Sequence, residues 1–518
     1  MHMQYLVNSQ EMKQYDKNTI EYYKIPSAVL MERAALAVSD EIKKQFKDPS
    51  QTNTILSVCG CGNNGGDGLA VARLLHLAGY RVEVLLPMGT EKMTAETRAQ
   101  YETIRQYQIP EIAELPESPS YAVIIDALFG IGLSRKIGGN LYKLVEKLNQ
   151  IPAYRIAVDI ASGISADTGA IQGIAFDADT TVTFGFAKYG QLFYPGAEYT
   201  GRLIVADIGI DTYSFLEQKP FGFYLKPEDI HAMLPERHAY SNKGSYGKVL
   251  IVAGSKDMAG AAYFSAKAAY YSGCGLVRIL TAKENRQILL TKLPEAIITT
   301  YDADTDDMTE CIAQLDDCMN WADSVLIGPG LGTSPNAKIL VAKVLSYAGK
   351  KIVFDADALN ILSKNLTMLK ESKADKIITP HLGEMSRLTG RPVTQIQQTL
   401  SETAAAFSIE YQTVCVLKDA RTVICAPDKT IYLNTTGNHG MATGGSGDVL
   451  AGLTAGFFAK SENAMQTAAL SCYLHGAAGD AAAQQKGMYS MTASDILEML
   501  PVVIQAADGG IVKDEKIQ

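Results

Sequence analysis

Residues 54–68 read TILSVCGCGNNGGDG, an apolar run that passes directly into a cluster of glycines. We predict a strand over Thr54–Val58, a tight glycine-rich turn, and a helix from about Leu69 to Ala78. Short strands rich in Val, Ile and Leu alternate with helical segments through the rest of the chain. This alternation predicts the α/β class with parallel sheets, because parallel strands need helical crossovers.

Length and charge limit the classes of protein that fit. A chain of 518 residues exceeds one usual core, so two or three domains are expected. A net charge of −9 without a dense basic run argues against nucleic acid or an anionic membrane as partner. The first residues lack an apolar signal core and no stretch is long enough to span a bilayer, so we predict a cytoplasmic protein. Cys59 and Cys61 are interpreted as free thiols rather than half of a zinc site.

A stretch that contains Pro220 and Pro227 interrupts the strand–helix alternation between Tyr213 and Glu236. We therefore predict two domains, residues 1–222 and residues 223–518. In the first domain, two helices are expected before the first strand, one ending before Pro26 and one over Ser27–Phe46.

The first glycine cluster has more than one interpretation. Gly60, Gly62 and Gly65 satisfy G-x-G-x-x-G, and Glu83 lies where a ribose-binding acid would, which predicts an NAD-dependent dehydrogenase. Asn63, Asn64 and Asp67 argue against this, because a pyrophosphate turn uses bare backbone there and a carboxylate repels phosphate. A simple turn with Asp67 as helix cap is the structural alternative.

Two later segments place further polar groups at strand ends. DALFGIGL begins at Asp126, and VDIASG contains Asp159 and Ser162. Because the carboxyl ends of parallel strands form one edge, we expect these groups to lie near Asn64 and Asp67 in one pocket. Their oxygen ligands suit a hard cation rather than zinc.

The order NNGGDG, DALFGIGL, VDIASG over the first 220 or so residues resembles the NAD(P)HX epimerase family. The resemblance implies a Rossmann-like, three-layer α/β/α domain that interconverts the C6 epimers of hydrated NADH and NADPH. It implies a potassium ion bound by Asn64, Asp126 and Ser162, and we expect Asp159 to carry the acid–base step. The implied substrate contacts are Asn63, Asn64, Gly65, Gly66, Asp67, Gly130, Ile131, Gly132, Leu133, Ser134, Arg135, Lys136 and Asp159.

The strongest local pattern of the second half is NHGMATGGSGD over residues 438–448. Glycine backbone N–H groups and a following helix can hold a phosphate, and Asp448 could take a proton from a hydroxyl during phosphoryl transfer. The lysine of a P-loop is missing, and a glycine-rich turn capped by Asp448 is the alternative. Four other segments follow predicted strands: GPGLG at 328–332, DADALN at 355–360, TPHLGEMSRL at 379–388 and KDART at 418–422.

These motifs, in this order, resemble the ADP- or ATP-dependent NAD(P)HX dehydratases, which have a ribokinase-like α/β fold. Leu382 stands after His381 where many relatives have Pro. The resemblance implies a nucleotide cosubstrate, with ADP favoured, a magnesium ion, and catalysis by Asp448. The implied contacts to the hydrated cofactor are Gly260, Gly332, His381, Leu382, Gly383, Glu384, Met385, Ser386, Arg387 and Asp448. The implied contacts to ADP are Lys418, Asp419, Ala420, Arg421, Thr422, Asn438, His439, Gly440, Met441, Ala442, Thr443, Gly444, Gly445, Ser446 and Gly447.

The sequence thus predicts a two-domain enzyme that repairs NADHX and NADPHX. Three alternatives stay open: a ribokinase-like kinase of a small molecule, a dehydrogenase that uses the first glycine loop, and a non-catalytic interaction protein. A homo-oligomer is expected, although no residue pattern indicates its symmetry.

Overall fold

The computed structural model describes residues 4–509, and it divides into two compact units. One unit is Tyr5–Phe221, and the other comprises Gln4 and the described residues from Gly222 onward. The division falls one residue before the domain limit that the sequence predicts. Whether residues 1–222 and 223–518 fold as separate domains stays a prediction.

The first unit contains a parallel sheet in the order β4-β3-β2-β5-β6-β7-β9. Its strands are β2 (Ile55–Cys59), β3 (Val82–Leu85), β4 (Glu111–Ile112), β5 (Val123–Ala127), β6 (Tyr154–Val158), β7 (Thr180–Phe184) and β9 (Arg202–Ala206). A separate parallel pair joins β1 (Gln4–Val7) and β8 (Ala187–Lys188). The main helices are α1 (Ser9–Glu21), α2 (Ser27–Gln45), α3 (Asn63–Leu77), α4 (Ala95–Gln106) and α5 (Gly139–Gln150), with short helices α6 (Tyr189–Leu192) and α7 (Gly196–Thr200).

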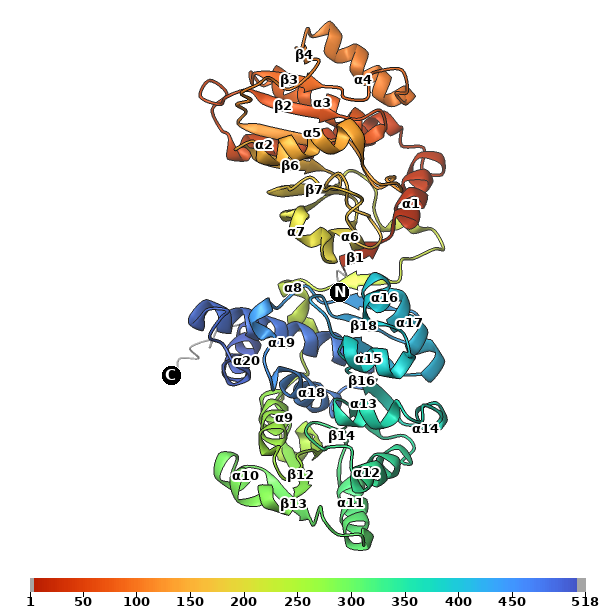
Figure 1. Cartoon of the computed structure of the whole chain (residues 1–518), viewed down its shortest axis with the longest axis vertical. Coiled ribbons are helices and arrows are strands. Elements are labelled where there is room, and N and C mark those ends of the chain that lie inside the picture. The colour runs from red at the N-terminus through yellow and green to blue at the C-terminus, as the bar shows by residue number, and fades with distance from the viewer. Residues whose placement is uncertain (1–3, 510–518) are drawn as a thin grey trace. The chain divides into compact units, whose positions relative to one another are not determined.

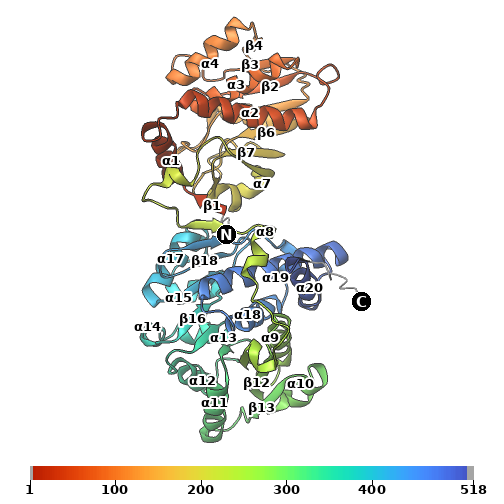
Figure 2. The same cartoon turned by 180° about the vertical axis from the view of Figure 1, so that it is seen from behind.

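Both faces of this sheet are buried, as the continuous apolar strands predict. In β2, Ile55 and Cys59 belong to the core under α2 and α3, whereas Leu56 and Val58 belong to the core under α5. Helix α5 lies in front of the sheet in Figure 1, and α2 lies in front when the molecule is viewed from behind in Figure 2. The predicted three-layer α/β/α arrangement is therefore confirmed for this unit.

Helix α3 begins earlier than the sequence predicts. We expected a loop over NNGGDG and a helix from about Leu69, but α3 starts at Asn63, directly after its N-cap Gly62. The glycines serve close packing rather than a flexible turn. A Cβ at Gly65 would lie 1.9 Å from the carbonyl oxygen of Gly60, and one at Gly68 would lie 2.4 Å from the Cβ of Ala127. The helix can approach the strand ends this closely only without side chains at these positions.

The second unit has strands in the order β13-β12-β11-β14-β15-β16-β17-β18-β19-β10. Their bounds are β10 (Gly222–Tyr224), β11 (Lys248–Val252), β12 (Leu276–Ala282), β13 (Ile297–Tyr301), β14 (Ser324–Ile327), β15 (Lys351–Phe354), β16 (Asp375–Ile378), β17 (Val414–Leu417), β18 (Val423–Cys425) and β19 (Ile431–Leu433). The strands from β13 to β17 pair in parallel, and β18 runs antiparallel to both β17 and β19.

Its helices are α8 (Pro227–Ile230), α9 (Ala259–Tyr271), α10 (Arg286–Lys292), α11 (Thr309–Trp321), α12 (Pro335–Leu345), α13 (Asp357–Leu362), α14 (Thr367–Glu371), α15 (Leu382–Thr389), α16 (Val393–Gln398), α17 (Leu400–Tyr411), α18 (Ser446–Phe458), α19 (Ala464–Lys486) and α20 (Ala493–Ala507). Within residues 4–509, no helix combines the length and apolar character needed to cross a membrane.

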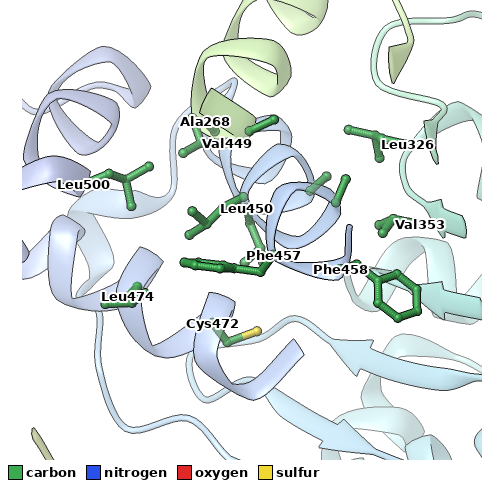
Figure 3. Close-up of a cluster of buried hydrophobic side chains, with 14 of the residues drawn as sticks. Ala268, Leu326, Val353, Val449, Leu450, Phe457, Phe458, Cys472, Leu474 and Leu500 are labelled. Atoms are coloured by element: carbon green, nitrogen blue, oxygen red, sulfur yellow. The ribbon is translucent and has the colours of Figure 1, made fainter. Parts of the chain in front are cut away.

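Helix α18 forms the centre of the core of this unit. Every residue from Val449 to Phe458 is buried. Figure 3 shows Leu450 and Phe457 on the side of Leu474 and Cys472 of α19, with Leu326 and Val353 of the sheet on the opposite side. Gly452 allows α9 to pack closely, because a Cβ there would lie 2.0 Å from the carbonyl oxygen of Ser265. This packing fixes the N-terminus of α18, where Asp448 lies.

Candidate active sites

A cavity of about 600 Å³ opens at the carboxyl ends of β2, β5 and β6 in the first unit. These strands are adjacent in the sheet, so the three polar motifs meet as the sequence predicts. The lining includes ten of the predicted side chains or backbone positions: Asn63, Asn64, Asp67, Gly130, Ile131, Gly132, Leu133, Ser134, Arg135 and Asp159. Gly65 and Gly66 are buried in α3 beneath it, and Lys136 is not part of the lining.

Asp159 follows β6 and has a backbone φ of 65°, a conformation that non-glycine residues seldom adopt. Its Oδ1 atom accepts hydrogen bonds from Lys188 Nζ at 2.6 Å and from Thr183 Oγ at 3.0 Å. Its backbone carbonyl accepts a bond from Gln191 at 2.6 Å. The surrounding structure thus holds both the backbone and the side chain of Asp159, as is typical of functional strand ends.

Lys188 is completely buried, yet it pairs with a carboxylate. No motif in the sequence includes Lys188. It lies on β8, beyond β7, and only the fold brings it to this rim. The sequence feature that could have indicated Lys188 is its place five residues after Thr183, close to the end of a predicted strand.

Asp126 and Ser162 lie together beneath the cavity. Both are fully buried; Ser162 donates to Asp126 from its hydroxyl at 2.6 Å and from its backbone N–H at 2.7 Å. Burial raises the pKa of Asp126 to about 6, although the hydrogen bonds from Ser162 oppose this. No lysine or arginine pairs with Asp126 in the described residues, so its charge lacks a countercharge of its own.

Asn64 adds an unsatisfied amide to this region. Both its Oδ1 and Nδ2 atoms are buried without a hydrogen-bond partner among residues 4–509. A Cβ on Gly130 would lie 3.5 Å from Oδ1, so the loop after β5 passes directly against this amide. A buried carbonyl oxygen without a donor is expected to have a partner that the protein does not supply.

Two further carboxyl groups, Asp67 on α3 and Asp16 on α1, line the same cavity. Burial raises the pKa of Asp67 well above its usual range, and the charges of Asp159 and Asp16 add to this. Burial also raises the pKa of Asp16. Asp16 was absent from the sequence-derived site because α1 carries no motif and joins the site only through tertiary packing.

In the second unit, Asp448 lies in the first turn of α18 rather than after a loop, because the helix already begins at Ser446. Gly445 precedes the helix with a φ of 92°, which favours glycine. Burial raises the pKa of Asp448 to about 7, with a further contribution from Asp355 and an opposing one from Lys418. Asp448 can therefore exchange a proton near neutral pH.

A buried network lies beside it at the ends of β15, β16 and β17. Lys418 Nζ is 3.0 Å from Asp355 Oδ1, and Thr379 donates to the same oxygen at 2.7 Å. Burial alone would lower the pKa of Lys418, but Asp355 and Glu384 outweigh it and raise the pKa. A Cβ on Gly447 would lie 3.4 Å from Lys418 Nζ, so this ammonium faces the N-terminus of α18. An ammonium and a helix N-terminus together are suited to bind an anion.

The TPHLGEMSRL segment has a structural role that the sequence analysis did not predict. His381 is the N-cap of α15, and its Nδ1 accepts the backbone N–H of Gly383 at 2.9 Å. The Glu384 carboxylate in turn accepts a hydrogen bond from the backbone N–H of His381 at 2.9 Å. Burial and the charge of Lys418 lower the pKa of His381, which keeps the imidazole neutral. Arg387 donates to Asn360 at 2.8 Å, which ties this helix to the DADALN segment.

The GPGLG segment lies against the start of α9. A Cβ on Gly330 would lie 2.8 Å from side chains of Met258 and Ala261, which flank Gly260. The backbone N–H of Gly332 donates to Asp357 Oδ2 at 2.8 Å. The GPGLG segment therefore packs against the residues on either side of Gly260, and the binding roles of Gly260 and Gly332 stay predictions.

The predicted nucleotide loop is held from behind by α19. Asp480 accepts the backbone N–H of Gly437 at 2.9 Å and the amide of Asn438 at 2.9 Å. His475 lies 3.4 Å from the Ser446 hydroxyl, and burial lowers its pKa to about 4. Arg421 donates to the carbonyl of Thr435. The remaining predicted nucleotide positions (Asp419, Ala420, Thr422, His439, Gly440, Met441, Ala442, Thr443, Gly444) lie on the two segments that these bonds support.

Known protein families match both halves of the chain. Residues 249–502 match the family model described as NAD(P)H-hydrate dehydratase, and residues 27–190 match the model described as YjeF-related protein N-terminus. The chain is 39% identical to the bifunctional NAD(P)H-hydrate repair enzyme of Moorella thermoacetica, with 97% of each chain covered. It is 34% identical to that of Escherichia coli, with 92% of this chain and 89% of the relative covered.

Solved structures resemble the second unit. A ribokinase-like superfamily protein from Enterococcus faecalis is 30% identical with a TM-score of 0.50, covering 55% of this chain and 96% of that one. An ADP/ATP-dependent NAD(P)H-hydrate dehydratase from Bacillus subtilis, co-crystallized with ATP/Mg²⁺, is 32% identical, covers 55% and 98%, and has a TM-score of 0.48. The fold expected from the second set of motifs is confirmed. On the full-length likeness and the two family matches, the chain belongs to the family of bifunctional NAD(P)H-hydrate repair enzymes.

Proposed function

We propose that this protein repairs hydrated NADH and NADPH, with an epimerase site in the first unit and a nucleotide-dependent dehydratase site in the second. The observation that carries the proposal is the presence of two separate rims in one chain. One rim gathers Asn64, Asp67 and Asp159 around a cavity, and the other gathers Lys418 and Asp448 at a helix N-terminus. A dehydratase that accepts one epimer needs an epimerase to use the other.

In the proposed epimerase site, Asp159 carries the acid–base step of the reaction at C6, the hydrated carbon of the nicotinamide ring. Its anchored carboxylate meets the geometric requirement for acid–base work. The residues expected to hold the rest of the substrate are Asn63 to Asp67 and Gly130 to Lys136, with Lys136 outside the present lining.

A potassium ion fits the residues beneath this cavity. Asn64 Oδ1 lacks a donor, and the buried Asp126 carboxylate lacks a cation, so a monovalent ion at Asn64, Asp126 and Ser162 would satisfy both. Alkali ions prefer such oxygen ligands. When bound, the ion would supply positive charge that positions the phosphate-bearing substrate.

In the proposed dehydratase site, the terminal phosphoryl group of ADP or ATP is transferred to the C6 hydroxyl oxygen, and Asp448 takes the proton of that hydroxyl. Backbone N–H groups of Gly444 to Gly447 and the Lys418 ammonium hold the phosphates. Phosphate is a better leaving group than hydroxide, so the lone pair of N1 can expel it from C6 and form an N1=C6 double bond. Loss of a proton from C5 to solvent then forms the C5=C6 double bond and returns the electron pair to N1. Magnesium would enter with the nucleotide and needs only one or two carboxylates. Asp355, Asp357 and Glu384 are available at the rim.

The test supplies chemically hydrated NADH, as mixed epimers, with ADP or ATP. Complete recovery of dihydronicotinamide absorbance supports both activities, and half recovery supports the dehydratase alone. A stable phosphorylated product would instead indicate the small-molecule kinase. If neither epimer reacts, the proposal is contradicted. We also propose a cytoplasmic homo-oligomer, for which light scattering measures the oligomeric state.

A further inference from the structure

The hydrogen bonds around Lys188 leave it no free proton to offer a substrate. Its ammonium donates to Asp159 Oδ1 at 2.6 Å, to Thr183 Oγ at 2.7 Å and to the carbonyl of Phe184 at 3.1 Å. An ammonium has three N–H donors, so all are used. Since the side chain is also fully buried, Lys188 acts on the cavity only through Asp159.

The same bonds divide the two oxygens of Asp159. Oδ1 accepts from Lys188, from Thr183, and from the backbone N–H of Phe184 at 3.4 Å. Within residues 4–509, Oδ2 has no hydrogen-bond partner, and the residue borders the cavity. The charge-assisted bond stabilises the ionised carboxylate, while Oδ2 remains free to accept a proton.

Asp67 borders the same cavity but, unlike Asp159, has no positively charged partner within residues 4–509. No salt bridge or side-chain hydrogen bond reaches it within the described residues, and its nearest charged influences are the carboxylates of Asp159 and Asp16. Burial without a countercharge favours the neutral acid. Asp159 pairs with a buried ammonium and Asp67 lacks a countercharge, and two carboxyl groups in such different surroundings are the usual arrangement of an acid and a base.

We propose that Asp67 is the proton donor and Asp159 the proton acceptor of the epimerase, and that Lys188 is the positioning residue that keeps their roles distinct. This inference rests on the proposed epimerase function of the first unit. It assigns the loss and re-addition of water at C6 to two carboxyl groups that face one cavity.

The proposed step balances as follows. Asp67 gives its proton to the C6 hydroxyl oxygen, the C6–O bond breaks to release water, and the lone pair of N1 forms an N1=C6 double bond. Water then adds to the other face of C6, the π pair returns to N1, and the extra proton passes to Oδ2 of Asp159. Solvent returns that proton to Asp67. Nothing is oxidised or reduced.

Charged groups of both signs surround the cavity in which the cationic intermediate would form. The groups that face Asp67 are Asp16 and Lys13 on α1, Glu96 on α4, Cys61 after β2, Arg135 after β5, Asp159 after β6 and Lys188 on β8. Lys188 and Asp159 neutralise each other. Of the others, the carboxyl groups of Asp16 and Glu96 favour positive charge on the ring, and Lys13 and Arg135 oppose it.

The test compares Asp67→Asn and Lys188→Met in the full-length protein, with Asp40→Asn and Lys143→Met as surface controls on α2 and α5. Epimer interconversion is measured by chromatography across pH, and dehydration of the accepted epimer reports that the protein is folded. Asp67→Asn is expected to lower the epimerisation rate about 100- to 10,000-fold without a matching change in KM. The wild-type rate should fall as pH rises through the pKa of Asp67, because the neutral acid is the donor.

Lys188→Met should move the acidic limb of the rate profile to higher pH, so that the loss of rate is largest on the acidic side of the profile. Thr183→Val keeps the ion pair and should show a smaller shift in the same direction, which preserves the test if Lys188→Met does not fold. A merely structural lysine would lower the rate equally at every pH, and that outcome overturns its assignment. Full epimerisation by Asp67→Asn overturns the donor assignment.

Oxygen-18 water tests the chemical route. Each epimerisation event should place solvent oxygen on C6, and product that keeps its original oxygen overturns the loss of water. If wild-type protein does not interconvert the epimers, the proposed function itself fails. If wild type interconverts them and Asp67→Asn does so equally well, only the present inference fails.

Discussion

Each of the two proposed sites has one acid–base residue, Asp159 in the first unit and Asp448 in the second. The electrostatic surroundings of these two carboxyl groups are opposite. In the first unit, Asp159 is 2.6 Å from a fully buried lysine that has no other charged partner within residues 4–509. In the second, Lys418 is paired with Asp355, and Asp448 is left among carboxyl groups with its pKa raised to about 7. The two acids therefore differ in whether a buried lysine pairs with them directly, as Lys188 does with Asp159, or pairs with a neighbouring carboxylate, as Lys418 does with Asp355 beside Asp448.

The largest expected effect separates the two sites completely. Asp448→Asn keeps the size of the side chain but cannot accept a proton, so dehydration should slow about 100- to 10,000-fold. ADP or ATP should still bind, because backbone N–H groups hold the phosphates. Steady-state dehydration and calorimetry measure the two quantities. Loss of nucleotide binding together with turnover would mean that Asp448 mainly holds the loop and caps the helix.

Asp159→Asn addresses the other side of the comparison. Epimerisation should be lost, while dehydration of the accepted epimer stays near normal, because the two acids belong to different compact units. Chromatography of each epimer follows both activities in one experiment. An equal loss of both would contradict the independence of the two sites.

The pH dependence should reflect the poised state of Asp448. The ionised form is the base, and the pKa is raised to about 7, so the dehydration rate should be full above that pH. It should fall about tenfold for each pH unit below it, because the ionised fraction decreases in that proportion. A rate that stays constant from pH 8 to pH 5 would contradict the assignment. Asp448→Glu is the matched control, because it keeps a carboxylate at this position.

The smallest expected effect concerns the cation. Potassium should stabilise the first unit relative to sodium by about 1–3 kcal/mol, the range that saturation of one site produces. This corresponds to a few degrees in melting temperature. Asn64→Ala should abolish the difference, because it removes the orphaned amide oxygen. Anomalous scattering from thallium identifies the site, and zinc or calcium there would contradict it.

The strand-end acids could be predicted from sequence because β2, β5 and β6 are neighbours in a parallel sheet, where motifs at strand ends must converge. Lys188 and Asp16 could not, since they arrive from β8 and α1 through packing that no local pattern encodes. The start of α3 was misplaced for a different reason. Glycines usually predict a loop, but Gly65 and Gly68 are needed where a helix touches a strand.

His381 illustrates a further limit. The histidine within TPHLGEMSRL predicts a ligand contact, and the structure shows in addition that its Nδ1 accepts the cap bonds of α15; the ligand contact stays a prediction. Side-chain capping and ligand binding use the same residue types at the same helix ends, so sequence alone does not separate them.

Helix α18 gives the second site an unusual kind of protection. Its residues from Val449 to Phe458 have no exposed face, so its amide hydrogens can reach solvent only when the whole unit opens. Amides in this helix should therefore be among the slowest to exchange with deuterated water. Asp448, the proposed base of the dehydratase, directly precedes this buried segment, so its loss of activity on heating is expected to follow the melting of the whole unit.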